Sequence, residues 1–334
     1  MKRRNFMQWG IGLGTVMAAG GASLAASTKN AGSLEWRSRT FNAMGTTMAF
    51  KAAHADADRV ERALDASVAD IRRIEDQMSL FRPDSALSEL NRTGVLHRPP
   101  ADLLAVLQTA QQVSRRSGGA FDVTVQPLWQ TFDAAQKQGR LPTIPEIAAA
   151  RKRVGWRAVD VSTDAIRLTR PGMGITLNGI AQGYAADKVK ARFQFMQIDH
   201  ALIDAGEWAS LGQPAHTGDW TLGIADPRDA QRLLTGMAMQ GACVATSADD
   251  QCAFSPDFAH HHIFDPQTGA SPTELSSVTV LAPSGVLADA LTKVFFMAGY
   301  DRALPLARSW KVDVLVVDKL GRWQASPGVA LRRS

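Results

Sequence analysis

Cysteine is scarce in this chain: Cys243 and Cys252 are the only two among 334 residues. This scarcity excludes a small fold that is held together by several disulfides. The two cysteines also lack partners at a recognised metal-site spacing, so they do not predict a zinc site. Two interpretations of the pair remain open. They form one disulfide that closes a hairpin across residues 246–250, or they are two separate buried thiols.

Several common functional motifs are also absent. No run of lysine and arginine indicates binding to nucleic acid. No Gly-x-Ser-x-Gly elbow indicates a hydrolase triad, and no Gly-x-Gly-x-x-Gly follows a first strand as in dinucleotide-binding folds. The formal net charge is only +5, and Lys2, Arg3 and Arg4 carry three of these charges, which leaves +2 for the chain after residue 26.

The N-terminus carries a targeting pattern. Arg3 and Arg4 open a twin-arginine motif, and the apolar stretch 9–22 that follows is too short to span a bilayer well. Small residues up to Ala26 suit a signal peptidase. We therefore predict a signal peptide over residues 1–26 and export to the periplasm. An N-terminal anchor, with association with the inner membrane, is the alternative.

The rest of the chain, residues 35–331, is predicted to form one α+β domain. The hydrophobic content of the full sequence, 45%, is ample for a core, and the chain contains no repeats. Apolar residues at three- and four-residue spacing, together with turn signals, predict most of the elements. The expected helices are 58–81, 101–117, a short one after the loop 141–145, 180–193, 287–297 and 300–308. The expected strands are 36–50, 121–125, 158–168, 174–177, 201–204, 220–225, 234–240, 278–281 and 312–317.

A glycine-containing turn between an apolar run and a helix is the most informative segment. Residues 175–187 place Gly179 and Gly183 at this junction. Glycine lets the backbone approach a phosphate closely, and a helix N-terminus offers amide donors to it. The pattern is common, so it predicts phosphate binding only together with other motifs.

Six further segments support this interpretation. Taken together with the turn, and in their order along the chain, they resemble the ApbE family of FAD:protein FMN transferases. They are residues 41–47, 79–91, 119–129, 201–206, 260–269 and 288–293. The resemblance implies a two-lobed α+β fold with mixed or antiparallel sheets and a cofactor cleft between the lobes. It also implies that FAD is split with the help of Mg²⁺ and that FMN is attached through a phosphoester to a Ser or Thr of a target protein. The variant around Gly179 is similar to the branch associated with nitrous oxide respiration.

The resemblance also implies which residues bind the flavin nucleotide. They are Met44, Gly45, Thr46, Asp122, Gly179, Gly183, Asp204, Thr246 and Ser247. Three neighbouring positions depart from the usual pattern. Gln182 stands where Lys is common, Glu207 and Trp208 follow Gly206 where Gly-Asp is commoner, and Ala248 replaces a Gly.

The same resemblance makes Asp289 a Mg²⁺ ligand, together with a backbone carbonyl near Ala181. Mg²⁺ takes one or two carboxylates plus phosphate and water, which suits a pyrophosphate site. The family usually has a Thr ligand four residues after this Asp, where this chain has Lys293, with Thr292 one position earlier. Positions i and i+4 share a helix face. Three outcomes are open: Lys293 points away, it takes over part of the cation's role, or the site is poor in metal.

Three consecutive histidines invite a metal-site interpretation. Neighbouring residues of an extended segment point to opposite faces, so His260 and His262 would share one side and His261 the other. A zinc site made of all three is therefore not expected. The resemblance identifies His262 as the general base, a role that suits an imidazole. The alternative is a histidine that only packs beside Asp265.

We thus expect a Mg²⁺-dependent transfer of FMN from FAD to a Thr or Ser hydroxyl, with release of AMP. The resemblance suggests membrane-bound flavoproteins of electron-transfer chains as targets. Two other functions remain open. One is an FAD pyrophosphatase, in which water replaces the target hydroxyl. The other is a non-catalytic flavin carrier, which Lys293 at the metal position would favour. The sequence predicts no oligomeric state.

Overall fold

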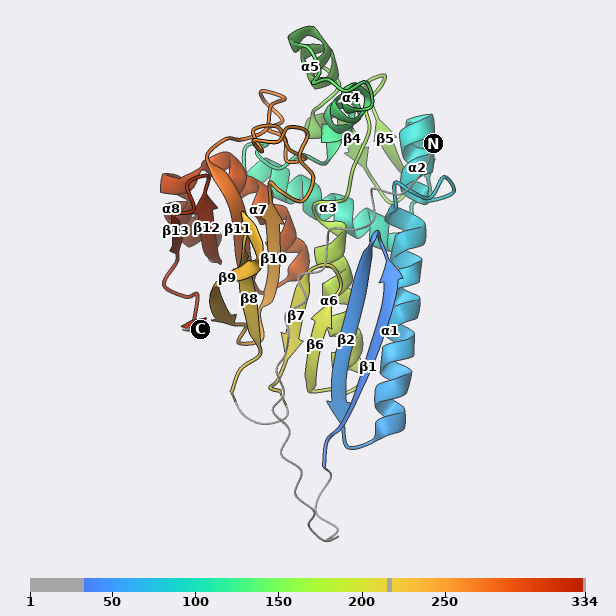
Figure 1. Ribbon diagram of the computed structural model, residues 1–334. Helices are drawn as coiled ribbons and strands as arrows, with labels where there is room; N and C mark the ends of the chain where they lie inside the picture. Colours follow the sequence, from blue (N-terminus) through green and yellow to red (C-terminus); the bar gives the residue numbers. More distant parts are fainter. Residues whose placement is uncertain (1–32, 215–217, 333–334) are drawn as a thin grey trace.

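The computed structural model describes residues 33–214 and 218–332, so the predicted signal peptide lies outside the described residues. The chain contains both helices and antiparallel sheets, with runs of helices and runs of strands, which confirms the α+β class (Figure 1). The helices are α1 (Ala57–Met78), α2 (Ala86–Thr93), α3 (Ala101–Arg116), α4 (Gln126–Gln136), α5 (Ile144–Arg151), α6 (Ala181–Phe195), α7 (Gly285–Ala298) and α8 (Tyr300–Trp310). Two short 3-10 helices are η1 (Val123–Val125) and η2 (Trp156–Ala158).

Three sheets organise the strands, and every pairing between the described strands is antiparallel. The eight-stranded sheet has the order β1-β2-β6-β7-β10-β11-β12-β13, and the small sheets have the orders β14-β9-β8 and β3-β5-β4. The strands are β1 (Glu35–Ala43), β2 (Thr46–His54), β3 (Val95–His97), β4 (Val159–Val161), β5 (Ala165–Leu168), β6 (His200–Asp204), β7 (Trp208–Leu211), β8 (Thr221–Asp226), β9 (Asp229–Ala238), β10 (Cys243–Ala248), β11 (Leu275–Ala282), β12 (Asp313–Asp318), β13 (Trp323–Ala325) and β14 (Leu331–Arg332).

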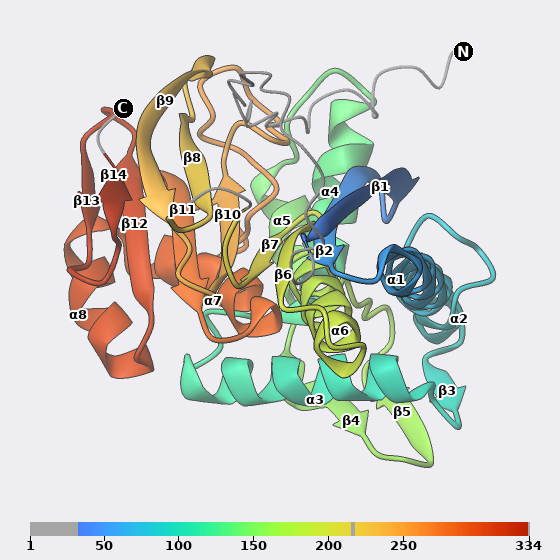
Figure 2. The ribbon, with the colours of Figure 1, turned by 90° about the horizontal axis from the view of Figure 1, so that it is seen from below.

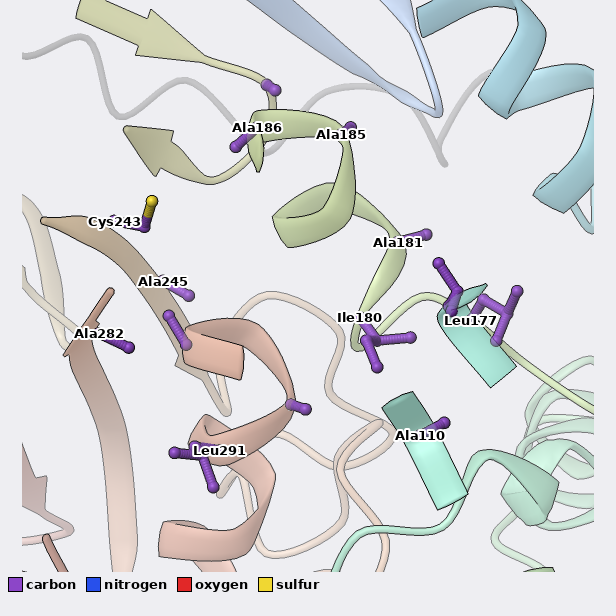
Figure 3. Packing of buried hydrophobic residues seen from close by; sticks show 14 of the residues in the cluster. Ala110, Leu177, Ile180, Ala181, Ala185, Ala186, Cys243, Ala245, Ala282 and Leu291 are labelled. Carbon is purple, nitrogen blue, oxygen red and sulfur yellow. The ribbon is translucent and has the colours of Figure 1, made fainter. Parts of the chain in front are cut away.

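The large sheet is covered on both faces. Helices α1, α6, α7 and α8 pack against one face, and α3 runs across the outer side of this helical layer (Figure 2). The sheet of β8 and β9 closes part of the other face through an apolar cluster that includes Met237, Leu281 and Leu315. All eight residues of β11 are buried as a consequence. Figure 3 shows small side chains such as Ala181, Ala245 and Ala282 in the main core, where they let the elements approach closely.

The expected strand 36–50 is in fact a hairpin. Strands β1 and β2 pair with Ala43 opposite Thr46, so Met44 and Gly45 form a two-residue turn. Both turn residues have positive φ values, 49° for Met44 and 79° for Gly45, as a type I′ turn requires. The expected strand 158–168 is likewise divided into η2, β4 and β5.

Two other expected strands do not form. Residues 121–125 contain η1, because the Asp122 side chain accepts a hydrogen bond from the Thr124 amide and turns the chain. The backbone of residues 174–177 forms its hydrogen bonds outside any sheet. The amide and carbonyl of Ile175 bond to the side chain of Asn91, and the Thr176 amide donates to the carbonyl of Val123.

Most helix predictions are confirmed, with shifted ends. Helix α1 begins at Ala57 and is capped by Asp56, whose carboxylate accepts a hydrogen bond from the Arg59 amide. Helices α2 and α4 were not predicted. Among the described residues no helix combines the length and the apolar character needed to cross a bilayer.

The two cysteines are free, so the disulfide is not formed. The Cys243 thiol is buried in the main core with its Sγ 3.5 Å from Oδ1 of Asp187. Burial, reinforced by this carboxylate, raises the pKa of Cys243 to about 12. Cys252 packs instead against the cluster of Phe132, Phe254 and Phe264.

Candidate active site

Helices α6 and α7 cap each other. The carboxylate of Asp187, on α6, accepts hydrogen bonds from the amides of Gly285 (2.6 Å) and Val286 (2.9 Å) at the start of α7. The carboxylate of Asp289, on α7, accepts from the amide of Gly183 (3.2 Å) at the start of α6. Neither helix has a side-chain cap of its own. Each helix therefore receives its N-terminal cap from the other.

Two glycines make this contact possible. A Cβ on Gly183 would lie 2.1 Å from the carbonyl oxygen of Gly285, and a Cβ on Gly285 would lie 2.4 Å from the carbonyl oxygen of Gly183. Gly183 therefore serves the close approach of two helices. It does not line the cavity described next, and its contact with a phosphate stays a prediction.

A cavity of about 150 Å³ opens where the start of α6, strand β10, η1 and the loop 249–274 meet. The loop lies beside α4 in Figure 1. The cavity brings together six of the predicted site residues: Asp122, Gly179, Thr246, Ser247, His262 and Lys293. Its wall also includes Gln126, Trp129, Asn178, Gln182, Glu207 and Phe264. Polar groups thus converge on a hollow with aromatic walls, as in small-molecule sites.

An ion pair forms one side of the cavity. The ammonium of Lys293 donates to Oδ1 of Asp289 at 2.6 Å and to the backbone carbonyl of Asp289 at 3.2 Å. The Asp289 side chain is 1% exposed and that of Lys293 18%, so the pair is shielded from water. The lysine stem lies over the glycine turn, because a Cβ on Gly179 would be 2.7 Å from Cε of Lys293.

The arrangement does not fit Mg²⁺ at Asp289. Both carboxylate oxygens are already engaged, one by the Lys293 ammonium and the other by the Gly183 amide. Thr292 does not supply the missing hydroxyl ligand, since it lies on the buried side of α7 and bonds to Ser247. No group of three His, Cys, Asp or Glu side chains able to hold a metal occurs in the described part of the chain. A protonated amine cannot ligate a metal, and it repels one.

His262 faces the cavity, and its neighbour does not. The Nδ1 atom of His262 is buried without a hydrogen-bond partner in the described residues. Burial, together with the nearby His261 and Lys293, lowers the pKa of His262 to about 4, so the ring is neutral at pH 7. The His261 ring bonds through Nε2 to the carbonyl of Pro272, at 3.0 Å, away from the cavity. His261 and His262 therefore point in different directions, as expected, while His260 does not line the cavity.

Glu207 is the site residue that sequence reasoning missed. It stood out only as a departure from the family pattern, yet it is buried, lines the cavity and accepts a hydrogen bond from the Thr246 amide. Burial, and then the carboxylate of Asp289, raises the pKa of Glu207 well above its usual value, while Lys293 opposes the shift. A buried carboxyl with such neighbours marks a functional site.

Three other predicted residues position the cavity wall through internal bonds. The Asp122 carboxylate accepts from the Thr124 amide and hydroxyl and from the Trp156 amide, and burial raises its pKa. On β10, the hydroxyl of Thr246 bonds to Thr279 and that of Ser247 bonds to Thr292, at 2.9 and 2.8 Å. The side-chain oxygen atoms of these three residues are thus fixed by hydrogen bonds to other residues of the protein.

Besides Gly183 and Asp289, five predicted residues are not part of the cavity wall. Met44, Gly45 and Thr46 belong to the hairpin turn, where the Met44 amide donates to Glu75. Asp204 accepts from the Gly206 amide, and burial raises its pKa to about 6. Ala181 is the buried first residue of α6. None of these five residues lines the cavity in this structure.

Comparisons with known proteins give this arrangement a family. The sequence model of the ApbE family matches residues 44–316. A relative from Klebsiella pneumoniae, named FAD:protein FMN transferase, is 30% identical over 75% of this chain and 80% of its own length. A relative of the same name from Treponema pallidum is 30% identical over 83% of this chain and 82% of its own length.

Solved structures agree with the sequence comparison. The ApbE protein of Thermotoga maritima is similar with a TM-score of 0.80 and 25% identity, covering 88% of this chain and 97% of that one. The apo form of the flavinyl transferase ApbE of Pseudomonas stutzeri is similar with a TM-score of 0.77 and 25% identity, covering 88% and 95%. The resemblance stated from the motifs is confirmed: this chain belongs to the ApbE family and is a transferase.

Proposed function

We propose that this protein transfers FMN from FAD to the hydroxyl of a Thr or Ser in a target protein and releases AMP. The observation that carries the proposal is His262, a neutral imidazole that faces a cavity also lined by Gly179 and Lys293. A base and a phosphate-binding group thus lie in one hollow. The names of the relatives point to the same reaction.

The chemistry requires a proton acceptor and positive charge. The hydroxyl oxygen of the target attacks the phosphorus of the FMN half of FAD, and its proton passes to the neutral His262 ring. The bond between this phosphorus and the bridging oxygen breaks, and that oxygen leaves with its electron pair as part of AMP. Lys293 stabilises the negative charge on the phosphate oxygens. His262 then returns its proton to solvent.

The location and the target are part of the proposal. The twin-arginine pattern at Arg3 and Arg4 supports export to the periplasm. We therefore propose a membrane-associated flavoprotein as the target, which exposes a Thr or Ser in the same compartment. The Mg²⁺ dependence that the resemblance implies stays a prediction, and the ion pair of Asp289 and Lys293 argues against it.

Intact-mass measurement tests the reaction directly. The purified protein is incubated with FAD and a flavoprotein domain that carries an acceptor Thr, and the same domain with that Thr changed to Ala is the control. We expect covalent FMN on the first domain only, with one AMP released for each FMN attached. Free FMN and AMP without attachment would indicate an FAD pyrophosphatase. Unchanged FAD would indicate a flavin carrier.

A further inference from the structure

We propose that the ammonium of Lys293 replaces the divalent cation in this protein, so that FAD binds without Mg²⁺. The inference rests on the proposed function, because FAD is the ligand it concerns. It comes from the disagreement between the expected metal site and the observed contacts of Asp289. One carboxylate oxygen of Asp289, which the resemblance assigns to a metal, receives the Lys293 ammonium at 2.6 Å.

The first argument is the geometry of the ammonium. An ammonium has three N–H donors, and two hydrogen bonds are found for Lys293 within the described residues, both to Asp289. The side chain also lines the cavity and is 18% exposed, so it can meet a ligand there. The remaining donor is therefore available to a phosphate oxygen in the cavity.

The second argument is the fit of the lysine to the glycine turn. A Cβ on Gly179 would lie 2.7 Å from Cε and 3.2 Å from Nζ of Lys293. Only a residue without a side chain leaves room for this lysine. The turn thus holds the stem of Lys293 against the wall of the cavity, and the ammonium is placed before a ligand arrives.

The third argument is the balance of charge. The carboxyl groups of Asp289 and Glu207 are both buried at this site. Lys293 forms the ion pair with Asp289, and its charge opposes the rise in the pKa of Glu207. A buried carboxylate needs a positive partner. With Thr in place of Lys293, a metal ion would have to supply that charge to Asp289. With Lys293 present the charge of Asp289 is already balanced, and a divalent ion would face repulsion from the ammonium.

The fourth argument is a second substitution in the same cavity. Gln182 stands where the family commonly has Lys, and it lines the cavity as Lys293 does. Its amide packs against Gly206, since a Cβ there would lie 2.6 Å from Cδ of Gln182. The cavity therefore lacks a lysine at the start of α6 and has one on α7. The site thus keeps one lysine charge, but this charge is on α7 instead of at the start of α6.

Binding measurements test the inference without the transfer reaction. The FAD affinity of the purified protein and of Lys293→Thr is measured by fluorescence titration, once with EDTA and once with Mg²⁺. We expect the unchanged protein to bind FAD equally well in both solutions. Lys293→Thr should bind FAD about tenfold or more weakly in EDTA, the effect of one lost charge-assisted hydrogen bond, and Mg²⁺ should restore its affinity.

Two further variants control the experiment. Lys137→Thr removes the lysine of an exposed pair with Asp133 at the same i,i+4 spacing, and it should leave FAD binding unchanged. Lys293→Met keeps an unbranched stem over Gly179 without the charge, so it should show the same loss in EDTA if Lys293→Thr does not fold. Calorimetric titration with Mg²⁺ alone should give no binding to the unchanged protein.

The possible outcomes separate this inference from the proposed function. If the unchanged protein binds FAD only when Mg²⁺ is present, the lysine does not replace the metal, although the transfer reaction can still hold. If Lys293→Thr keeps its full affinity in EDTA, the inference is likewise overturned. If the unchanged protein binds no FAD under either condition, both this inference and the proposed function fail.

Discussion

Asp187 and Asp289 each cap the helix to which the other belongs. Asp187 accepts from the first two amides of α7, and Asp289 accepts from the Gly183 amide of α6. A helix normally takes such a cap from the residue just before it. Here the caps cross between helices that are about a hundred residues apart in sequence. The start of α6, which follows Gly179, and helix α7, which carries Lys293, are therefore held in one fixed geometry.

The first prediction concerns this crossed capping. Asp187→Ala leaves the amides of Gly285 and Val286 without acceptors, so we expect the free energy of unfolding to fall by about 2 kcal/mol. Urea denaturation followed by circular dichroism measures the change. Asp58→Ala, which alters an exposed aspartate early in α1, is the control. Equal stability of the two variants would show that the cap contributes little.

The second prediction concerns the contact of the two glycines. Gly183→Ala would place a Cβ 2.1 Å from the backbone oxygen of Gly285, and backbone cannot rotate away as a side chain can. The two helices must then separate, and we expect a loss of about 3 kcal/mol of stability. In Gly174→Ala the nearest atom to the new Cβ is 3.4 Å away, in the Gln126 side chain, so this variant should unfold nearly as the unchanged protein does. Thermal unfolding of both variants decides the point.

The third prediction concerns the different effects of His262 and His261 on the rate of FMN transfer. His262→Gln removes the neutral ring from the cavity, and the rate of FMN transfer should fall by about 10²–10⁴-fold, as for a lost general base. His261→Gln alters a ring that points to Pro272, so its rate should stay within a few fold of the unchanged protein. Rates come from the mass assay with saturating target domain. A similar loss in both variants would contradict the assignment of His262.

The fourth prediction concerns pH and stability. Burial lowers the pKa of His261 to about 4, below its unfolded value of about 6.5. The unfolded chain thus binds a proton between these values that the folded chain does not. The contribution of His261 is present in full above pH 6.5 and is lost as the pH falls toward 4, by about 3 kcal/mol.

His261→Gln isolates this contribution, because Gln can still donate to the Pro272 carbonyl. The difference in unfolding free energy between the unchanged protein and the variant should increase from pH 4.5 to 6.5 and then become constant. Urea denaturation at several pH values gives this difference. His97→Gln changes an exposed histidine and serves as the control. A difference that does not depend on pH would refute the linkage.

Elements with a clear local pattern could be predicted from the sequence. The spacing of Val60, Leu64 and Ile71 predicted α1, and all three are buried. The hairpin of β1 and β2 was not predicted, because the positive φ of Met44 is a property of the folded turn. The segment 174–177 has the composition of a strand, but its backbone bonds to a side chain from α2 and to a residue of η1.

Prediction of the site from the sequence was limited in the same way. The motifs identified His262 and Ser247, which do line the cavity. They could not show the direction of Lys293, since an i+4 position fixes a helix face but does not show that the ammonium pairs with Asp289 and that the stem lies over Gly179. The importance of Glu207 was also hidden, because its burial depends on β10 and α7, which come later in the chain. Contacts between distant elements decide such features.

The complete burial of β11 has a consequence for how the cavity moves. With β10 and β12 on its edges and both faces covered, its amides should exchange with deuterium only when the whole molecule unfolds. Thr246 and Ser247 are paired with this strand and share its protection. The loop 249–274 belongs to none of the sheets. It contains an isolated bridge between Ala253 and His261, and its Phe254 and Phe264 pack against Phe132 of α4. The amides of this loop should therefore exchange before those of β11, so the wall of the cavity that carries His262 is expected to be less protected than the wall that carries Thr246 and Ser247.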